Sequence, residues 1–309
     1  MNFDLHHGDC LQVLATLPDA CVDAVVTDPP YGLSAAPNSG KASSGGFMGQ
    51  AWDYDVPSVE IWTECLRVLK PGGHLLAFAG TRTQHRMAVR IEDAGFEIRD
   101  MLAWVYATGF PKSHNLKGDW EGWGTALKPA LEPITLARKP IEGNVAANVL
   151  AHGTGAINVD GCRVGTDGGC KGAGRGPQGA VYGDGLNGAF APAVPGLGRW
   201  PSNLIHDGSD ETSSLLSDAA RFFYTPKAST AERQGVTHPT VKPLDLMAYL
   251  CRLITPPNGT ILDPFMGSGT TIKAAMSEGF KAIGIERDPD YFAMAQQRLN
   301  ETQLGFQLL

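Results

Sequence analysis

The stretch Val25–Gly32 places a carboxylate, two prolines and an aromatic side chain directly after an apolar, β-branched run. Asp28 and the rigid backbone carbonyl of Pro29 can each accept a hydrogen bond. The prolines restrict the backbone, so these acceptors are held with little freedom, and Tyr31 adds an aromatic side chain next to them. A strand end followed by a proline turn, without any chemistry, is the alternative interpretation.

A second stretch with chemical potential lies near the other end of the chain. There the short apolar run 260–262 is followed by Asp263, by Gly267 and Gly269, and by a helical pattern that opens on two threonines. Glycines let the backbone approach a ligand closely, and the first N–H groups of a helix are free to bind it. The stretch predicts a cofactor-binding turn, with a tight turn that binds nothing as the alternative.

Glu286 supports the cofactor interpretation. It ends the next extended run, 282–285, and follows Gly267 by 19 residues. An acidic residue at that strand end can accept hydrogen bonds from the ribose of a nucleotide cofactor. The turn itself does not have the G-x-G-x-x-G spacing of dinucleotide sites, which favours a smaller nucleoside cofactor. A solvated strand end is the alternative for Glu286.

Composition limits the class of protein without naming it. The chain has 309 residues, 43% of them hydrophobic and 18% charged, which suits one large domain or one domain with an insertion. A formal net charge of −7 does not indicate a nucleic-acid binder, although a local basic face would suffice. We find neither a membrane span nor a signal peptide pattern, and so expect a cytoplasmic protein with no membrane partner. The histidines and cysteines show no zinc-like spacing, and no metal is expected.

Extended and helical patterns alternate along most of the chain, which is typical of α/β domains. The pattern predicts an open, mostly parallel sheet with helices on both faces. Such sheets bind ligands outside the carboxyl ends of their strands, so the two turns would meet if 22–27 and 260–262 are neighbouring strands. We expect strands at 3–7, 22–27, 74–79, 96–106, 132–137, 260–262 and 282–285, and helices at 10–17, 59–69, 83–94, 244–254, 270–278 and 289–300.

Residues 140–235 interrupt this alternation. Between Gly165 and Gly198, twelve of 34 residues are glycine, and almost no helix signal is present, which is typical of a mobile loop. The predicted organisation is therefore an α/β half at 1–139, an inserted loop-rich region at 140–235 and a second α/β half at 236–309.

Several stretches resemble the β-class of S-adenosylmethionine-dependent DNA amino-methyltransferases of bacteria and phages. In that class the D-P-P-Y motif lies near the N-terminus and the F-x-G-x-G motif near the C-terminus, a circularly permuted order that this chain shares. The resemblance covers roughly residues 4–139 and 222–300 and implies a Rossmann-like fold. It rests on "DPPYG" in 8–32, on "HPTVKP" and "DPFMGSGTT" in 238–271, on "GIERDPDYFAMAQQRL" in 284–299, and on "LAWVYATGFPKSHN" and "EPITLARKP" between them.

The resemblance implies transfer of a methyl group from S-adenosylmethionine to the exocyclic amine of adenine in duplex DNA, after the base is flipped out. Asp28 and the carbonyl of Pro29 would hold the amine, Pro29 and Pro30 would keep both acceptors still, and Tyr31 would stack on the base. The reaction needs no metal. Enzymes that methylate carbon-5 of cytosine use a cysteine after a proline, and this chain has no Pro-Cys dipeptide.

The resemblance also implies which residues bind the cofactor. Asp9 in "HGDC" matches an acidic residue that binds the cofactor's adenine, although it can equally be a helix N-cap, or serve both roles. The segment 238–243, "HPTVKP", would lie near the methionine end of the cofactor, or be only a proline-rich helix entry. The predicted set is Asp9, Asp263, Phe265, Gly267, Ser268, Gly269, Thr270 and Glu286.

The insertion, 140–235, occupies the position of the target-recognition region in this class, so double-stranded DNA is the expected partner. Asn203 and Gln178 could read adenine edges, but nothing assigns them. A homodimer and a restriction endonuclease partner stay open. Seven basic residues are candidate DNA contacts, each with an ordinary surface role as the alternative: Arg163, Lys171, Arg175, Arg199, Arg221, Lys227 and Arg233.

Three alternative functions stay open. The amine of cytosine could be the target, although D-P-P-Y rather than S-P-P-Y favours adenine. Methylation of RNA or of a protein amide is more often associated with N-P-P-Y, so Asp28 and the long insertion argue against it. A binding module that has lost its chemistry would not need to keep Asp28, Pro29, Tyr31, Gly267 and Glu286 together.

Overall fold

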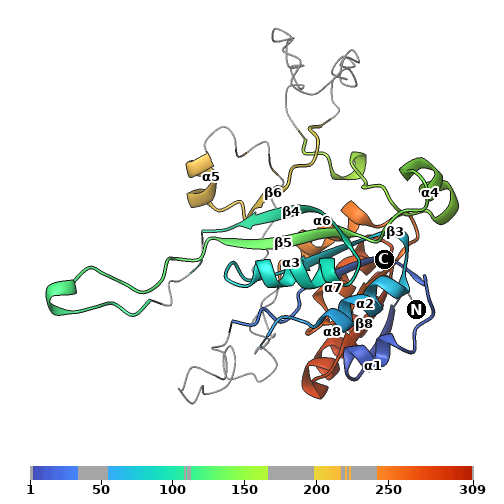
Figure 1. Ribbon diagram of the computed structural model, residues 1–309, viewed down its shortest axis with the longest axis horizontal. Helices are drawn as coiled ribbons and strands as arrows, with labels where there is room; N and C mark the ends of the chain where they lie inside the picture. The colour runs from blue at the N-terminus through green and yellow to red at the C-terminus, as the bar shows by residue number, and fades with distance from the viewer. Residues whose placement is uncertain are drawn as a thin grey trace, which may run out of the picture.

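The computed structural model describes residues 3–33, 55–107, 109, 113–165, 198–216, 220, 223 and 242–307, and the glycine-rich stretch between Gly165 and Gly198 lies outside these ranges. Within them, one open sheet has the strand order β1-β8-β7-β2-β3-β5-β4-β6. Figure 1 shows β5, β4 and β6 side by side at one edge of this sheet. Its strands are β1 (Phe3–His7), β2 (Val22–Thr27), β3 (Leu69–Phe78), β4 (Glu97–Val105), β5 (Leu131–Arg138), β6 (Leu204–His206), β7 (Thr260–Asp263) and β8 (Lys281–Glu286).

Strand β5 runs antiparallel to its neighbours β3 and β4, and every other pair in the sheet is parallel. The predicted open, mostly parallel sheet is therefore confirmed. Strand β1, from the start of the chain, pairs with β8, from its far end, with Phe3 opposite Ala282. Because the two ends of the chain meet within the sheet, the permuted motif order is compatible with an intact Rossmann-like sheet.

All six predicted helices are present, with small differences at their ends. Helix α1 ends at Leu14 rather than at Leu17, and α8 continues to Gln307 rather than ending at Asn300. Helices α4 and α5 lie in the predicted insertion and were not expected. No helix in the described part of the chain combines the length and the apolar character needed to cross a membrane. The helices are α1 (Cys10–Leu14), α2 (Val59–Val68), α3 (Gln84–Asp93), α4 (Val145–His152), α5 (Asp210–Leu216), α6 (Leu244–Ile254), α7 (Thr270–Ser277) and α8 (Pro289–Gln307), with short 3₁₀ turns η4 (Gly118–Trp120) and η5 (Asp160–Cys162).

Strand β2 is buried along its whole length because helices cover both faces of the sheet. Alternate side chains of the strand point into two separate cores. Ala24 and Val26 belong to the core formed with α6, α7 and α8, whereas Val25 belongs to the core formed with α1, α2 and α3. The predicted helices on both faces are confirmed. The "DPPYG" segment 28–32, called the catalytic turn below for its predicted role, follows a strand that is packed on both faces.

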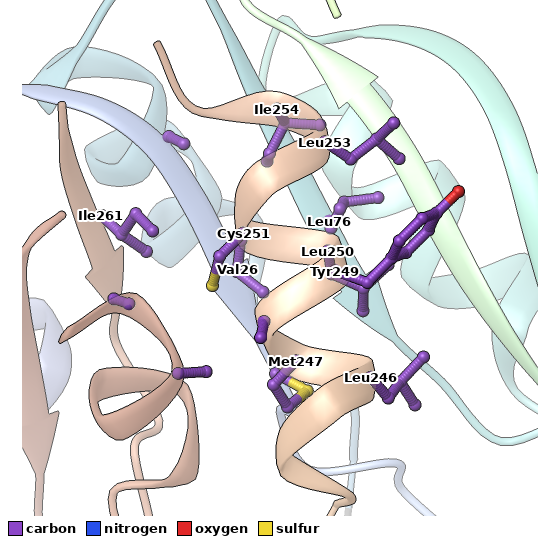
Figure 2. Packing of buried hydrophobic residues seen from close by; sticks show 14 of the residues in the cluster. Val26, Leu76, Leu246, Met247, Tyr249, Leu250, Cys251, Leu253, Ile254 and Ile261 are labelled. Carbon is purple, nitrogen blue, oxygen red and sulfur yellow. The ribbon is translucent and has the colours of Figure 1, made fainter. Parts of the chain in front are cut away.

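Helix α6 is buried around most of its circumference. Figure 2 shows it lying across Val26, Leu76 and Ile261, which come from three adjacent strands. Its outer side is covered by chain from the predicted insertion, where the backbone N–H of Asn158 donates to the carbonyl of Leu253 at 2.8 Å. The helix that follows the "HPTVKP" segment is thus held firmly against the strands that carry the catalytic and cofactor turns.

Strand β6 was not predicted, and it places part of the insertion in the sheet. It pairs in parallel with β4, with Ala103 opposite Leu204 and Val105 opposite His206. The strand is too short to show a period in the sequence, and it is stabilised by β4 rather than by its own pattern. The domain boundaries at 1–139, 140–235 and 236–309 stay a prediction.

Strand β3 begins earlier than the sequence predicts. Helix α2 ends at Val68, within one residue of the predicted end, but β3 starts at Leu69, opposite Val22 of β2, rather than at His74. The register of β2 with β3 shifts between the pairs Val22–Leu69 and Ala24–His74. The cause of the early start is a buried carboxylate on β2. Asp23 accepts a hydrogen bond from Lys70 Nζ at 2.6 Å and another from the backbone N–H of Thr260 at 2.7 Å, so it joins the starts of three strands.

Strands β2 and β7 are neighbours and run in parallel, with Ala24 opposite Ile261 and Val25 opposite Leu262. This is the arrangement on which the two-turn interpretation depended, and it is confirmed. Both strands therefore deliver the residues that follow them to the same edge of the sheet.

We predict that Asp23→Ala lowers the free energy of unfolding by about 2 to 4 kcal/mol, because it leaves Lys70 and the N–H of Thr260 without their buried acceptor. Urea denaturation followed by circular dichroism measures the change. The matched control is Asp19→Ala, since Asp19 also pairs with a basic side chain, Arg67, but is 79% exposed. We expect little change for the control. Equal losses in the two variants would contradict the role of Asp23.

Candidate active site

A buried hydrogen bond joins the catalytic turn to the cofactor turn. The hydroxyl of Thr27, the last residue of β2, donates to Oδ1 of Asp263 at 2.7 Å. The same oxygen accepts the backbone N–H of Phe265 at 3.1 Å. Neither Thr27 nor Asp263 has appreciable solvent exposure. The start of the cofactor turn is thereby fixed to the strand end that precedes Asp28.

Asp263 was predicted to bind cofactor, and the structure gives its carboxylate a positioning role in this joint. Burial raises the pKa of Asp263 to about 6, an effect that hydrogen bonds from Thr27 and Thr271 only partly oppose and that the charge of Asp28 reinforces. Because Asp263 is only 1% exposed, its carboxylate holds the turn instead of presenting its oxygens to solvent.

Both carboxylate oxygens of Asp28 have donors. Oδ1 accepts from the hydroxyl of Tyr31 at 2.7 Å, and Oδ2 accepts from Lys242 Nζ at 2.7 Å. The backbone carbonyl of Tyr31 accepts the hydroxyl of Thr83 at 2.6 Å. The turn then closes at Gly32, whose φ of +62° and whose contact with the backbone beside Val56 leave no room for a side chain. The "DPPYG" stretch is thus a rigid loop.

Lys242 and Glu132 complete this cluster, and the sequence did not single out either one. Oε2 of Glu132 lies 3.0 Å from the hydroxyl of Tyr31 and 3.1 Å from Lys242 Nζ. Lys242 was present only as one letter of "HPTVKP", and Glu132 as the first residue of an extended run. A lysine's charge and its position in the sequence do not show which carboxylate it contacts. Only knowledge of the strand order in the sheet would have identified the Lys242–Glu132 pair.

Aromatic rings surround the ammonium group of Lys242. Nζ lies 4.9 Å from the ring centre of buried Phe78 and 5.4 Å from that of Tyr31. Burial alone would lower the pKa of Lys242, but the nearby charges of Asp28 and Glu132 outweigh it, so the pKa is raised and the lysine stays charged.

Burial and the charges of the two carboxylates determine the pKa shifts in this cluster. Burial raises the pKa of Tyr31 well above its ordinary value, and the charges of Asp28 and Glu132 raise it further, which keeps the phenol neutral. Burial also raises the pKa of Asp28, with the charge of Lys242 opposing the shift and that of Glu132 adding to it. Burial and Glu132 together raise the pKa of Tyr106 to about 12.

Two aromatic residues of β4 and the loop after it lie at the same edge. The ring centres of Trp104 and Tyr106 are 5.1 Å apart, and the rings are tilted by 46°. Trp104 is opposite Glu132 in the pairing of β4 with β5. Aromatic surface therefore borders the acidic cluster, as a site that receives a planar ring requires.

Glu286 ends β8 as predicted, and its carboxylate holds the cofactor turn. Oε2 accepts the backbone N–H of Gly267 at 2.9 Å, and Oε1 accepts that of Asp288 at 2.7 Å. Burial raises the pKa of Glu286, while these backbone hydrogen bonds oppose the shift. Each carboxylate oxygen has a second lone pair, so Glu286 can still accept a ligand hydroxyl.

The cofactor turn is built for close approach of the backbone. Gly269 has a φ of +79°, and a side chain there would press on Ala295 of α8. The carbonyl of Ser268 accepts a hydrogen bond from Arg298 at 2.5 Å. Next to it, the hydroxyl of Thr270 is buried at the start of α7 and has no hydrogen-bond partner among the described residues. An unsatisfied hydroxyl at a helix N-terminus fits a polar ligand.

The predicted cofactor residues come together at the carboxyl ends of three adjacent strands. Asp9 follows β1 and caps α1, accepting from the N–H of Leu11 at 3.0 Å. The N–H of Gly8 donates to the carbonyl of Glu286, so Asp9 lies beside the end of β8. The N-cap role of Asp9 is confirmed, and its contact with a cofactor stays a prediction.

Of the basic residues predicted to contact DNA, only two lie within the described ranges. Arg163 Nε bonds to Asp160 at 2.7 Å, and its guanidinium lies 5.4 Å from the ring centre of exposed Trp200. The backbone of Arg199 pairs with that of Val164. Nδ2 of Asn203 lies 3.3 Å from Oδ1 of Asp100. Outside the described residues are Lys171, Arg175, Gln178, Arg221, Lys227, Arg233 and 238–241.

With this geometry in place, comparison with known proteins assigns the family. A family model described as DNA methylase, which covers N6 and N4 methyltransferases, matches residues 22–297 and so includes both turns. The chain belongs to the DNA methylase family. The resemblance of this DNA methylase to the β-class amino-methyltransferases, drawn from the sequence, is confirmed.

The relatives of this DNA methylase agree with the assignment. Type II methyltransferase M.HindIII of Haemophilus influenzae is 30% identical over 257 residues, which are 78% of this chain and 68% of that protein. TTHA0409 of Thermus thermophilus, complexed with S-adenosyl-L-methionine, gives a TM-score of 0.50 at 22% identity, covering 96% of this chain and 95% of that one. PvuII DNA methyltransferase, which is cytosine-N4-specific, gives 0.52 at 16% identity, covering 96% and 86%. At such identities the two structures show a shared fold.

We predict that the free energy of unfolding of the wild type falls as pH rises from about 4 to about 7, and that it falls less in Asp263→Asn. Burial raises the folded-state pKa of Asp263 to about 6. The stabilising contribution of its proton is therefore complete below the pKa of a free aspartate and is lost as pH rises through the folded-state value. Asparagine cannot ionise and lacks this dependence. Urea denaturation at several pH values measures it, with Asp19→Asn as the exposed control, and identical pH profiles for wild type and Asp263→Asn would refute the prediction.

Proposed function

We propose that this DNA methylase transfers a methyl group from S-adenosylmethionine to the exocyclic amine of adenine in duplex DNA. The observation that carries the proposal is the joint between the two turns. Because Thr27 donates to Asp263 at 2.7 Å, the acceptor Asp28 and the cofactor turn are held at one edge of one sheet. A methyl transfer needs this kind of fixed proximity between the amine and the donor.

The cofactor would lie against the ends of β1, β8 and β7. The candidate contacts there are Asp9, Glu286, the turn from Phe265 to Gly269, and the hydroxyl of Thr270. The unpartnered Thr270 hydroxyl and the absence of side chains at the glycines of the turn support this fit. When bound, S-adenosylmethionine supplies an electrophilic methyl group on a sulfonium. TTHA0409, which shares the fold, has been solved with S-adenosyl-L-methionine bound.

The catalytic turn would hold the target amine. The exocyclic amine of adenine is a poor nucleophile because its lone pair is conjugated with the ring. Acceptance of its two N–H groups by Asp28 and by the carbonyl of Pro29 favours a tetrahedral nitrogen with a localised lone pair. The hydroxyl of Tyr31 is fixed by Asp28 and Glu132, and its ring would stack on the flipped base.

The choice of adenine over cytosine rests on the catalytic motif. The family includes both N6 and N4 methyltransferases, and the cytosine-N4-specific PvuII enzyme has the same fold, so fold does not separate the two targets. Asp28 in D-P-P-Y, where S-P-P-Y would favour cytosine, supports adenine. The similarity to a type II methyltransferase supports site-specific methylation as part of restriction-modification.

We predict that the protein, incubated with tritiated S-adenosylmethionine and duplex DNA of mixed sequence, places label in N6-methyladenine. Digestion of the DNA to nucleosides and chromatography identify the labelled base. Structured RNA and a protein mixture serve as competing substrates, and we expect no transfer to either. Label in N4-methylcytosine would reject adenine while keeping the DNA amino-methyltransferase, and label only in RNA or protein would reject DNA as the substrate.

We also predict that Asp28→Asn lowers kcat by about 10²- to 10³-fold, because the amide is a weaker acceptor and one of its two positions is a donor. Binding of S-adenosylmethionine, measured by calorimetry, is expected to change little, since Asp28 lies on the catalytic turn. The control Asp19→Asn replaces an exposed aspartate and is expected to keep wild-type turnover. An Asp28→Asn variant that methylates as fast as wild type would refute the assignment.

A further inference from the structure

Two hydrogen-bond donors at the catalytic turn are shared by two carboxylates. The Tyr31 hydroxyl carries one proton, yet it lies 2.7 Å from Asp28 Oδ1 and 3.0 Å from Glu132 Oε2. Lys242 Nζ lies 2.7 Å from Asp28 Oδ2 and 3.1 Å from Glu132 Oε2. Each donor is slightly closer to Asp28. Lys242 has three N–H groups and also lies 3.0 Å from the Tyr31 hydroxyl, so it can contact both carboxylates at once, whereas the single Tyr31 proton can go to only one of them.

This sharing bears directly on the reaction proposed above. In the structure both oxygens of Asp28 are engaged by Tyr31 and Lys242. An incoming amine needs one of those oxygens as its acceptor. A donor displaced from Asp28 would lose a buried hydrogen bond, which is costly if no other acceptor replaces it. Glu132 offers a replacement acceptor within reach of both donors.

Burial makes the charges of this cluster interdependent. The side chain of Lys242 is only 8% exposed and lies against Phe78, which is fully buried. A buried ammonium needs compensating negative charge, and Asp28 and Glu132 both supply it. When an oxygen of Asp28 accepts a hydrogen bond from a bound amine, the carboxylate of Glu132 still balances the positive charge of Lys242.

We propose that Glu132 and Lys242 are positioning residues for Asp28. Lys242 holds the Asp28 carboxylate in place and ionised, and Glu132 receives the Tyr31 hydroxyl and the Lys242 ammonium when the amine binds to Asp28. The inference rests on the proposed function and deepens it, because both residues act through the carboxylate of Asp28.

The proposal sets the direction of two pH effects. Asp28 must be ionised to accept the amine, so the acid limb of kcat/KM against pH follows the ionisation of Asp28. Glu132, on β5, raises the pKa of Asp28, and Lys242, before α6, lowers it. Within the described part of the chain, Tyr31 on the same loop and Asp263 at the end of β7 also interact electrostatically with Asp28.

The test is the pH profile of kcat/KM for DNA methylation by Glu132→Gln and Lys242→Met in the full-length protein. We expect the acid limb to move to lower pH in Glu132→Gln and to higher pH in Lys242→Met, each by about half a unit to one unit or more. We also expect kcat of Glu132→Gln to fall about tenfold, while the KM for S-adenosylmethionine stays within about twofold of wild type, since the residue acts on Asp28.

Matched controls separate this role from a general structural one. Glu121→Gln and Lys128→Met change exposed residues in the segment between β4 and β5 and are expected to leave the acid limb unmoved. Glu132→Asp keeps the charge, so its acid limb is expected to lie closer to that of wild type than the acid limb of Glu132→Gln does. If Lys242→Met does not fold, as judged by circular dichroism, Lys242→Arg keeps the charge and is expected to retain the wild-type acid limb.

The outcomes are distinct. Opposite shifts of the acid limb in Glu132→Gln and Lys242→Met support the proposal. An active wild type whose acid limb stays unmoved in Glu132→Gln, or moves in the same direction in both variants, overturns the positioning role and leaves the methyltransferase function standing. A wild type that methylates neither adenine nor cytosine in DNA overturns the proposed function, and this inference with it.

Discussion

The whole site depends on the parallel pairing of β2 with β7, two strands that lie more than 200 residues apart in the chain. Pairing brings the strand ends together, and the hydrogen bond from Thr27 to Asp263, at 2.7 Å, fixes them side by side. Because β2 is buried on both faces, its end has little freedom to move. Proximity of an amine acceptor to a cofactor turn is thus a property of the sheet rather than of either loop.

A second constraint follows from charge buried at this edge. Lys242, Asp28 and Glu132 come from three distant parts of the chain, and the ammonium lies within 3.1 Å of an oxygen of each carboxylate. Such a cluster is a weak source of stability, since the loss of solvation opposes the attraction. The cluster affects chemistry more than stability, because the pKa values of Asp28 and Tyr31 depend on the charged groups around them.

Membership of the DNA methylase family is consistent with both features, and the family includes enzymes for two different bases. Because the family covers both N6 and N4 methyltransferases, family membership does not select the base. Selection must therefore come from the few side chains that meet the base. We propose Asp28 and Tyr31 of the "DPPYG" turn for this role, together with Trp104, which lies opposite Glu132, and the adjacent ring of Tyr106.

The sequence alone determined the α/β class, most strand and helix positions, and the positions of both turns, because hydrophobic periodicity and turn residues are local signals. It placed the start of β3 at His74 instead of Leu69, where Lys70 pairs with buried Asp23 of β2, and it did not find β6, a strand that depends on β4. Only the tertiary structure placed Glu132 and Lys242 around Asp28. That contact joins residues more than 100 positions apart, and no local pattern encodes which distant carboxylate a lysine will face.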